Sequence, residues 1–135
     1  MIVQFMLDTN AASDIIKRPD GKVASKAIEL GPDRIGLSAV VAAELLFGVE
    51  KRGSPRLALL IDGVVSRFPV VDFSLEASRT YGKVRDKLRR AGNPIGPLDT
   101  LIAAHAISLE ATLLTNNTAE FRRVEGLKIE DWTQP

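Results

Sequence analysis

Cysteine is absent from this chain of 135 residues, and histidine occurs only once, at position 105. The first absence excludes disulfides, thiolate metal ligands and a cysteine nucleophile. With one histidine, neither a zinc site of the usual Cys/His type nor an acid–base pair of two histidines is easily built. His105 stands in the apolar segment 103–107, so we expect it to be a packed, structural residue.

Long apolar runs are also missing, and none approaches the length that a membrane span needs. Residues 1–8 lack the basic start and the small-residue cleavage site of a signal peptide. We therefore expect a cytoplasmic protein that has no membrane partner. The sequence has no G-x-S-x-G, Walker or G-x-G-x-x-G motif, so esterase, nucleoside triphosphatase and dinucleotide-binding functions lack a supporting motif.

Neither sign of charge dominates, because 18 Lys and Arg stand against 17 Asp and Glu, for a net charge of +1. This balance neither requires nor excludes a nucleic-acid partner. Arg79, Lys83, Lys87 and Arg90 recur on one face of a predicted helix. A solvated helix face is the favoured interpretation of this stripe, and phosphate contact with RNA is the alternative.

The length suits a single domain, residues 1–135, and a hydrophobic share of 45% is enough for a core. Short apolar runs alternate with longer helical patterns, which predicts an α/β fold with a parallel sheet and helices on both faces. Strands are expected at 2–7, 35–38, 69–72, 111–115 and 127–129, the last at an edge. Helices are expected at 11–17, 22–30, 39–51, 54–67, 74–91 and 98–110.

Predicted helix starts follow from capping residues. Ser38 and Ser74 precede strong helical patterns and are expected to cap them. Thr9 or Asn10 is expected to cap the first helix, and Thr118 could cap a short turn of helix after the fourth strand.

Four carboxylates are expected at one edge of this sheet, where ligand sites of parallel sheets form. Asp8 directly follows the first strand, and Glu120 comes soon after the fourth. Glu44 is the only charge in the apolar segment 40–48, and Asp99 opens a buried helix. Each has an ordinary alternative: a helix cap for Asp8, a buried ion pair for Glu44, a favourable first-turn position for Asp99 and a solvated loop for Glu120.

Taken together, the four acids predict a metal site. Carboxylates brought close together stay ionised only with a cation nearby. An oxygen-only ligand set suits Mg²⁺, for which Mn²⁺ can substitute, and Asn116 and Asn117 could add neutral oxygens. Such ions activate water and neutralise the leaving oxygen at a phosphodiester. These residues therefore indicate a metal-dependent nuclease without distinguishing RNA from DNA.

Several segments, in order along nearly the whole chain, match one family: 5–10, 38–48, 98–106, 114–124 and the closing 126–132. The chain resembles VapC-type toxins of the PIN-domain superfamily, which belong to type II toxin–antitoxin pairs. The resemblance implies a PIN-like three-layer fold with a short, mostly parallel sheet of four to five strands. It also implies a Mg²⁺-dependent endoribonuclease.

The resemblance also implies roles for individual residues. Asp8 and Asp99 would bind the metal directly, and Glu44 would complete the triad directly or through water. Many relatives carry Asp just after the fourth strand, where this chain has Asn116 and Asn117, and Glu120 is the candidate replacement. Residues that would orient water or ligands from outside the triad are Thr9, Ser38, Thr115, Asn116 and Asn117.

The family resemblance implies partners as well. A VapB-type antitoxin would place a helix in a groove of the toxin and a basic tail in the acidic site. Ala11, Ala12, Ile15 and Ile16 are the candidate groove wall, with ordinary core packing as the alternative. A toxin homodimer is expected within the complex. The C-terminal motifs resemble the subgroup that cuts initiator tRNA in its anticodon loop.

Three other functions compete with this interpretation. A non-catalytic PIN-like module that binds RNA or protein would explain the altered fourth acidic position. A phosphodiesterase acting on DNA would use the same metal chemistry. An α/β phosphate-switch domain would need paired acids after the first strand, and Asp8 has no acidic neighbour.

Overall fold

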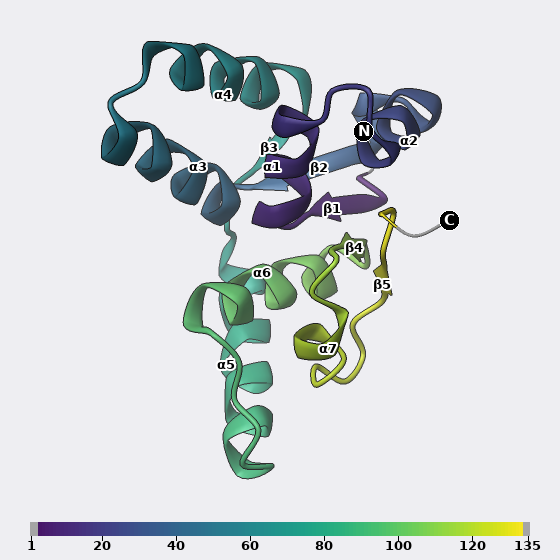
Figure 1. Ribbon diagram of the computed structural model, residues 1–135. Coiled ribbons are helices and arrows are strands. Elements are labelled where there is room, and N and C mark those ends of the chain that lie inside the picture. The colour runs from purple at the N-terminus through teal and green to yellow at the C-terminus, as the bar shows by residue number, and fades with distance from the viewer. Residues whose placement is uncertain (1–2, 134–135) are drawn as a thin grey trace.

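A computed structural model describes residues 3–133, and in this part of the chain five short strands form one sheet (Figure 1). Every neighbouring pair is parallel, and the strand order is β3-β2-β1-β4-β5. The predicted α/β fold with a parallel sheet is therefore confirmed, including the edge position of the last strand. Ile2 of the predicted first strand lies outside the described residues. The strands are β1 Phe5–Leu7, β2 Ile35–Ser38, β3 Val70–Val71, β4 Thr112–Leu114 and β5 Ile129–Glu130.

Helices connect the strands and cover both faces of the sheet. In Figure 1, α1 to α4 lie on one side of the sheet and α5 to α7 on the other, which gives three layers. No helix in residues 3–133 is both long enough and apolar enough to cross a membrane. The helices are α1 Thr9–Lys17, α2 Lys22–Leu30, α3 Ala39–Arg52, α4 Pro55–Arg67, α5 Leu75–Arg90, α6 Pro97–Ser108 and α7 Thr118–Phe121, with a 3₁₀ turn at Pro32–Arg34.

Side-chain caps fix where most of these helices begin. The hydroxyls of Ser38, Ser54 and Ser74 accept backbone N–H groups at the starts of α3, α4 and α5, so the two caps predicted from sequence are confirmed. The predicted cap of α1 is wrong. Asp8, not Thr9 or Asn10, accepts the N–H of Ala11 at 2.7 Å, because its extended backbone places it one residue before the helix.

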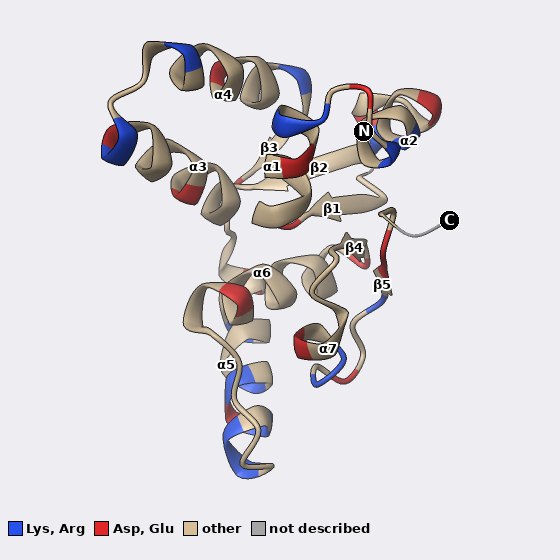
Figure 2. Cartoon of the chain, in the orientation of Figure 1, with Lys and Arg blue, Asp and Glu red and all other residues tan. Residues whose placement is uncertain are grey.

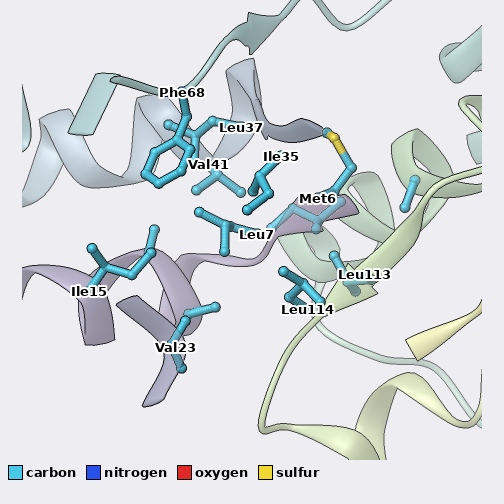
Figure 3. Packing of buried hydrophobic residues seen from close by; sticks show 14 of the residues in the cluster. Met6, Leu7, Ile15, Val23, Ile35, Leu37, Val41, Phe68, Leu113 and Leu114 are labelled. Atoms are coloured by element: carbon cyan, nitrogen blue, oxygen red, sulfur yellow. The ribbon is translucent and has the colours of Figure 1, made fainter. Parts of the chain in front are cut away.

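The core surrounds the central strand β1. Met6 and Leu7 point to opposite faces of the sheet and are both buried, as expected for a strand covered on both sides. Figure 3 shows Leu7 close to Leu37 and Val41, with Leu113 and Leu114 on the neighbouring strand β4. This packing fixes the register of the three central strands, so their carboxyl ends meet at one edge.

Helix α6 is buried along most of its length, as its apolar sequence predicts. Ile102 and the alanines 103, 104 and 106 are almost fully covered. Small side chains let α6 pack closely against the neighbouring α5. The position of Asp99 in the first turn of α6 is therefore set by the core.

Candidate active site

The carboxyl edge of the sheet brings together the four acids that the sequence singles out. Asp8 follows β1 directly, Glu44 lies in the second turn of α3, and Asp99 and Glu120 lie at the starts of α6 and α7. Their charges act on one another: Glu120, Asp8 and Glu44 each contribute to raising the pKa of Asp99. The structure therefore places the other three carboxyl groups within electrostatic reach of Asp99, and Glu44 within reach of Asp8.

Asp8 is buried at the centre of this cluster, with only 3% of its surface exposed. Burial is the main cause that raises the pKa of Asp8, and the charges of Glu44 and Asp131 add to it. The Thr115 side chain and the N–H of Ala11 act in the opposite direction by stabilising the carboxylate. Asp8 is thus both the helix cap of the alternative interpretation and a member of the acid cluster.

Glu44 is held by a residue from another helix. The hydroxyl of Thr9 in α1 donates a hydrogen bond to Glu44 Oε1 at 2.9 Å, as the expected orienting role of Thr9 requires. The sequence predicts a Glu44 away from the solvated surface, but its side chain is only half-buried and its apolar neighbours Leu46 and Phe47 are exposed. The alternative of a buried ion pair does not hold, since Glu44 makes no ion pair with Lys or Arg in residues 3–133.

Asp99 and Glu120 interact most strongly. Burial, a hydrogen bond shared with Glu120 and the charge of Glu120 raise the pKa of Asp99 to about 7. The pKa of Glu120 is lowered, chiefly because the N–H of Gly96 donates to its Oε1 at 3.0 Å. Asn117 donates its side-chain amide to the second oxygen of Glu120. Near neutral pH, Asp99 is therefore the group of this pair that takes up a proton.

Helix α7 also holds the loop of residues 93–97, which leads into α6. Besides the Glu120 contact with Gly96, Arg123 donates to the carbonyl of Pro94 at 3.0 Å. The Thr100 hydroxyl donates to the carbonyl of Gly96 at 2.8 Å. Both carboxylate oxygens of Glu120 accept hydrogen bonds from the chain. These contacts fix the loop and, through it, the start of α6, which carries Asp99.

The residues expected around the triad fall into two groups. Thr115 lies near Asp8, and its Oγ1 accepts the N–H of Asn117 at 2.9 Å. Asn117 reaches Glu120, whereas Asn116 is exposed and its side chain makes no hydrogen bond within residues 3–133. Thr118 is the first residue of α7 and not its cap, a place that Asn117 takes without a side-chain bond.

The hydrogen bonds of Ser38 connect α3 with α6 and involve none of the four carboxylates. Its fully buried Oγ caps α3 and lies 2.8 Å from His105 Nδ1. His105 is 1% exposed, packs edge-on against Phe73 and has its pKa lowered by burial. It is a packed histidine, as the sequence predicts.

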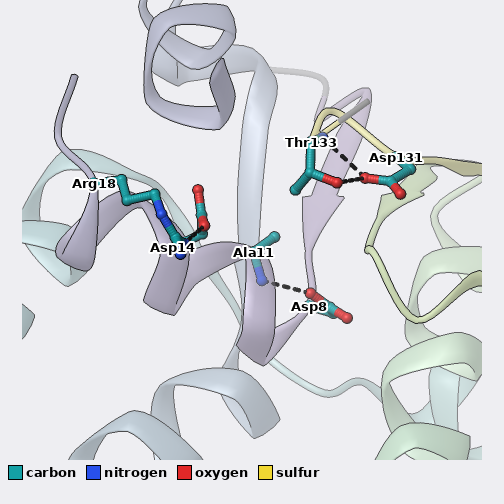
Figure 4. A network of polar contacts seen from close by, with 6 residues as sticks. All are labelled: Asp8, Ala11, Asp14, Arg18, Asp131 and Thr133. Atoms are coloured by element: carbon teal, nitrogen blue, oxygen red, sulfur yellow. Dashed lines mark hydrogen bonds and ion pairs between the residues drawn. The ribbon is translucent and has the colours of Figure 1, made fainter. Parts of the chain in front are cut away.

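Asp131 belongs to the surroundings of Asp8 and is missed by the sequence reasoning. Its charge contributes to the raised pKa of Asp8, and it accepts a hydrogen bond from the N–H of Thr133 at 2.9 Å. Figure 4 shows it on the C-terminal segment beside the start of α1. The sequence could have identified Asp131, because it directly follows β5 just as Asp8 directly follows β1.

The donor set of this cluster fits a hard divalent cation. All its ligand atoms are oxygens, and within residues 3–133 no Lys or Arg pairs with Asp8, Glu44 or Asp99. In the same part of the chain, no three acidic side chains stand close enough to enclose an ion by themselves. This arrangement suits Mg²⁺, which keeps several waters and takes only one or two protein carboxylates directly.

Comparisons with known proteins give the family. The family model described as PIN domain matches residues 5–127. The chain is 41% identical to the tRNA(fMet)-specific endonuclease VapC of Shigella flexneri, over 98% of this chain and 100% of that protein. It is 38% identical to the ribonuclease VapC2 of Rickettsia felis, over 95% of this chain and 97% of that protein.

Solved structures agree with these matches. The crystal structure of DNA-bound VapBC from Salmonella typhimurium contains a chain that superposes with a TM-score of 0.92 at 37% identity, covering 97% of this chain and 99% of that one. The VapBC-1 structure from nontypeable Haemophilus influenzae gives a TM-score of 0.85 at 36% identity, covering 99% and 100%. The chain therefore belongs to the PIN-domain family, and within it to the VapC-type endoribonuclease toxins.

The raised pKa of Asp99 predicts a pH-dependent stability. Between the ordinary value of 3.8 and about 7, the folded chain holds a proton that the unfolded chain has released. This contribution makes the free energy of unfolding rise as the pH falls from 8 to 5. In metal-free urea unfolding, the free energy of unfolding of Asp99→Asn should therefore exceed that of wild type most above pH 7. This difference should shrink toward pH 5. Asp62→Asn, on the exposed side of α4, should track wild type; a pH-independent gain for Asp99→Asn would contradict the assignment.

The contacts of Glu120 predict different effects for two substitutions. Glu120→Gln keeps an acceptor for the N–H of Gly96, so RNA cleavage should stay within a few-fold of wild type. Glu120→Ala removes both acceptors and frees the 93–97 loop, and kcat should fall roughly 10- to 100-fold, as for other residues that orient metal ligands. Single-turnover cleavage measures both. Equal, severe losses in the two variants would instead assign the carboxylate charge of Glu120 a direct role.

Proposed function

We propose that this toxin hydrolyses RNA phosphodiester bonds with Mg²⁺ held by Asp8 and Asp99 and, directly or through water, by Glu44. We also propose that its substrate is initiator tRNA, cut in the anticodon loop in the cytoplasm. The observation that carries the proposal is the charge cluster itself. Four carboxyl groups from four separate segments share one edge. Burial, a hydrogen bond with Glu120 and the charges of Glu120, Asp8 and Glu44 together raise the pKa of Asp99 to about 7. A cation relieves this repulsion.

The residues of the chain act by holding and orienting. Asp8 is fixed by the N–H of Ala11, and Glu44 by the hydroxyl of Thr9. Glu120 keeps the start of α6 in place, so that Asp99 faces the other acids. When bound, Mg²⁺ would stabilise the charge that develops on the phosphate and lower the pKa of an attacking water. Because Asp99 must lose its proton for this, metal binding near pH 7 should release a proton.

The substrate is inferred from the relatives. The VapC proteins of Shigella flexneri and Salmonella typhimurium are tRNA(fMet)-specific endonucleases, and they match 98% and 97% of this chain. The matched range includes both ends of the acid cluster, from Asp8 to Glu120. RNA specificity generally comes from unpaired loop nucleotides, which suits a cut in an anticodon loop.

A groove on the α1 side of the sheet supports a VapB-type antitoxin as partner. It has a volume of about 340 Å³ and lies between α1, α2 and α4. Of the predicted wall, Ile15 and Ile16 line it, whereas Ala11 and Ala12 do not line it and are buried in the core. An amphipathic helix fits such an apolar groove. We also infer that the toxin dimerises within this complex, which light scattering of the purified complex would test.

Cleavage of initiator tRNA tests the proposed reaction. Purified wild-type protein with Mg²⁺ should give two discrete fragments, which EDTA should abolish and added Mn²⁺ restore. Asp99→Asn should lower the rate by at least about 100-fold, because it removes a carboxylate that holds the metal. Elongator tRNA and a DNA oligonucleotide of the same loop sequence are the matched controls. Cutting that survives both EDTA and Asp99→Asn would overturn the mechanism.

The groove predicts where the antitoxin is held. Ile28 and Leu59 line it with 62% and 74% of their surfaces exposed, so either can become Asp without disturbing the core. Ile28→Asp and Leu59→Asp should weaken binding of a VapB-type antitoxin by at least about tenfold while cleavage stays normal. Leu75→Asp, equally exposed at 69% but outside the groove, is the control. Unchanged antitoxin affinity in both groove variants would place the partner elsewhere.

A further inference from the structure

A second hollow lies beside the acid cluster, between α5 and the 93–97 loop. It has a volume of about 410 Å³. We call it the loop pocket. Its apolar floor is made by Leu88, Ile95 and Pro97, and its rim carries Tyr81, Arg85 and Arg89.

The first turn of α6 forms one wall of the loop pocket and also carries Asp99 of the acid cluster. Pro97 and Thr100 line the pocket, and Asp99 lies between them in the first turn of α6. The adjoining Gly96 is bound to Glu120, and Arg123 holds Pro94, which also lines the pocket. The wall is therefore fixed by the same contacts that position the acid cluster, so a ligand in the pocket would keep a defined distance from Asp99.

The rim offers an aromatic ring and a cation together. The guanidinium carbon of Arg85 lies 5.9 Å from the centre of the Tyr81 ring, and its Nη1 donates to the Tyr81 hydroxyl at 3.0 Å. Arg89 forms an ion pair with Asp86 at 2.8 Å, whereas Arg85 has no carboxylate partner within residues 3–133. Tyr81 thus holds an uncompensated positive charge at the mouth of an apolar hollow.

This combination suits a nucleotide. Proteins that read single-stranded RNA stack splayed bases on aromatic rings and guanidinium planes, and bind the phosphates with Arg. The acid cluster repels RNA phosphates, so the substrate needs positive charge nearby. Figure 2 shows Lys and Arg concentrated along the part of α5 away from the sheet, with acidic residues at α6 and α7.

We propose that the loop pocket binds an unstacked nucleotide of the RNA substrate next to the bond that is cut, with Tyr81 and Arg85 contacting its base and phosphate. This proposal rests on the proposed function. In this proposal, α5 contacts the RNA at one specific site and not through the whole basic stripe of Arg79, Lys83, Lys87 and Arg90. Two of those four are engaged elsewhere, Lys87 with Glu125 and Arg90 with Asp86.

Steady-state cleavage of an initiator tRNA transcript tests the pocket. Tyr81→Ala and Arg85→Ala should each raise KM on the order of tenfold, as loss of one stacked base does, with kcat changed much less. Tyr81→Phe keeps the ring and should stay near wild type. Arg79→Ala removes the same charge from an exposed position of α5 outside the pocket, and KM should change less than about twofold. Thermal unfolding of each variant confirms that the fold is intact.

A binding measurement separates the pocket from the chemistry. In the Asp99→Asn background, a transcript with 4-thiouridine in its anticodon loop should crosslink to the peptide containing Tyr81, and Tyr81→Ala should abolish that crosslink. Equal KM losses for Arg79→Ala and Arg85→Ala, or crosslinks confined to other elements, would overturn the proposal. If wild-type protein fails to cut the transcript, the proposed function fails, while the crosslink still decides the pocket.

Discussion

Parallel pairing of β1 with both β2 and β4 is the constraint on which the site depends. Because the three strands run the same way, whatever follows each of them emerges at the same edge of the sheet. Asp8, the helix with Glu44 and the segment with Glu120 arrive there from distant parts of the sequence, and the buried α6 adds Asp99. The apolar packing of Leu7, Leu37 and Leu114 thus supports a cluster of charges that would not assemble unaided.

Bringing several carboxylates together is electrostatically unfavourable, and hydrogen bonds from the chain partly offset this repulsion. Three of the four carboxylates are held by neutral donors of the chain: an N–H for Asp8 and Glu120, a hydroxyl for Glu44. Such donors orient a carboxylate without neutralising it, whereas an Arg partner would compete with a cation. For Asp99, burial, a hydrogen bond with Glu120 and the neighbouring negative charges raise the pKa to about 7. A site built in this way favours a divalent ion over a permanent ion pair.

Features that depend on neighbours in sequence were predictable, and features that depend on distant partners were not. The caps at Ser38 and Ser74, the buried α6 and the positions of the strands along the chain follow from local patterns. The exposure of Phe47 and the Thr9 bond to Glu44 depend on how α1 packs against α3, which no local pattern encodes. The cap of α1 is Asp8, which the sequence offered only as an alternative, because Thr9 and Asn10 are equally good capping residues and their backbone conformation cannot be read from the sequence. The contact of Glu120 with Gly96 spans 24 residues, and the approach of Asp131 to Asp8 depends on β5 joining the sheet edge.

The buried contact between Ser38 and His105 has a consequence for how this chain can evolve. It joins the start of α3 to α6, the two helices that carry Glu44 and Asp99, through two residues that are buried inside the protein. A change at either residue would alter the spacing of the two carboxylates without altering any group in the site. Positions 38 and 105 should therefore vary as a pair, and exchanging one of them between relatives without the other would impair a toxin whose acids are all intact.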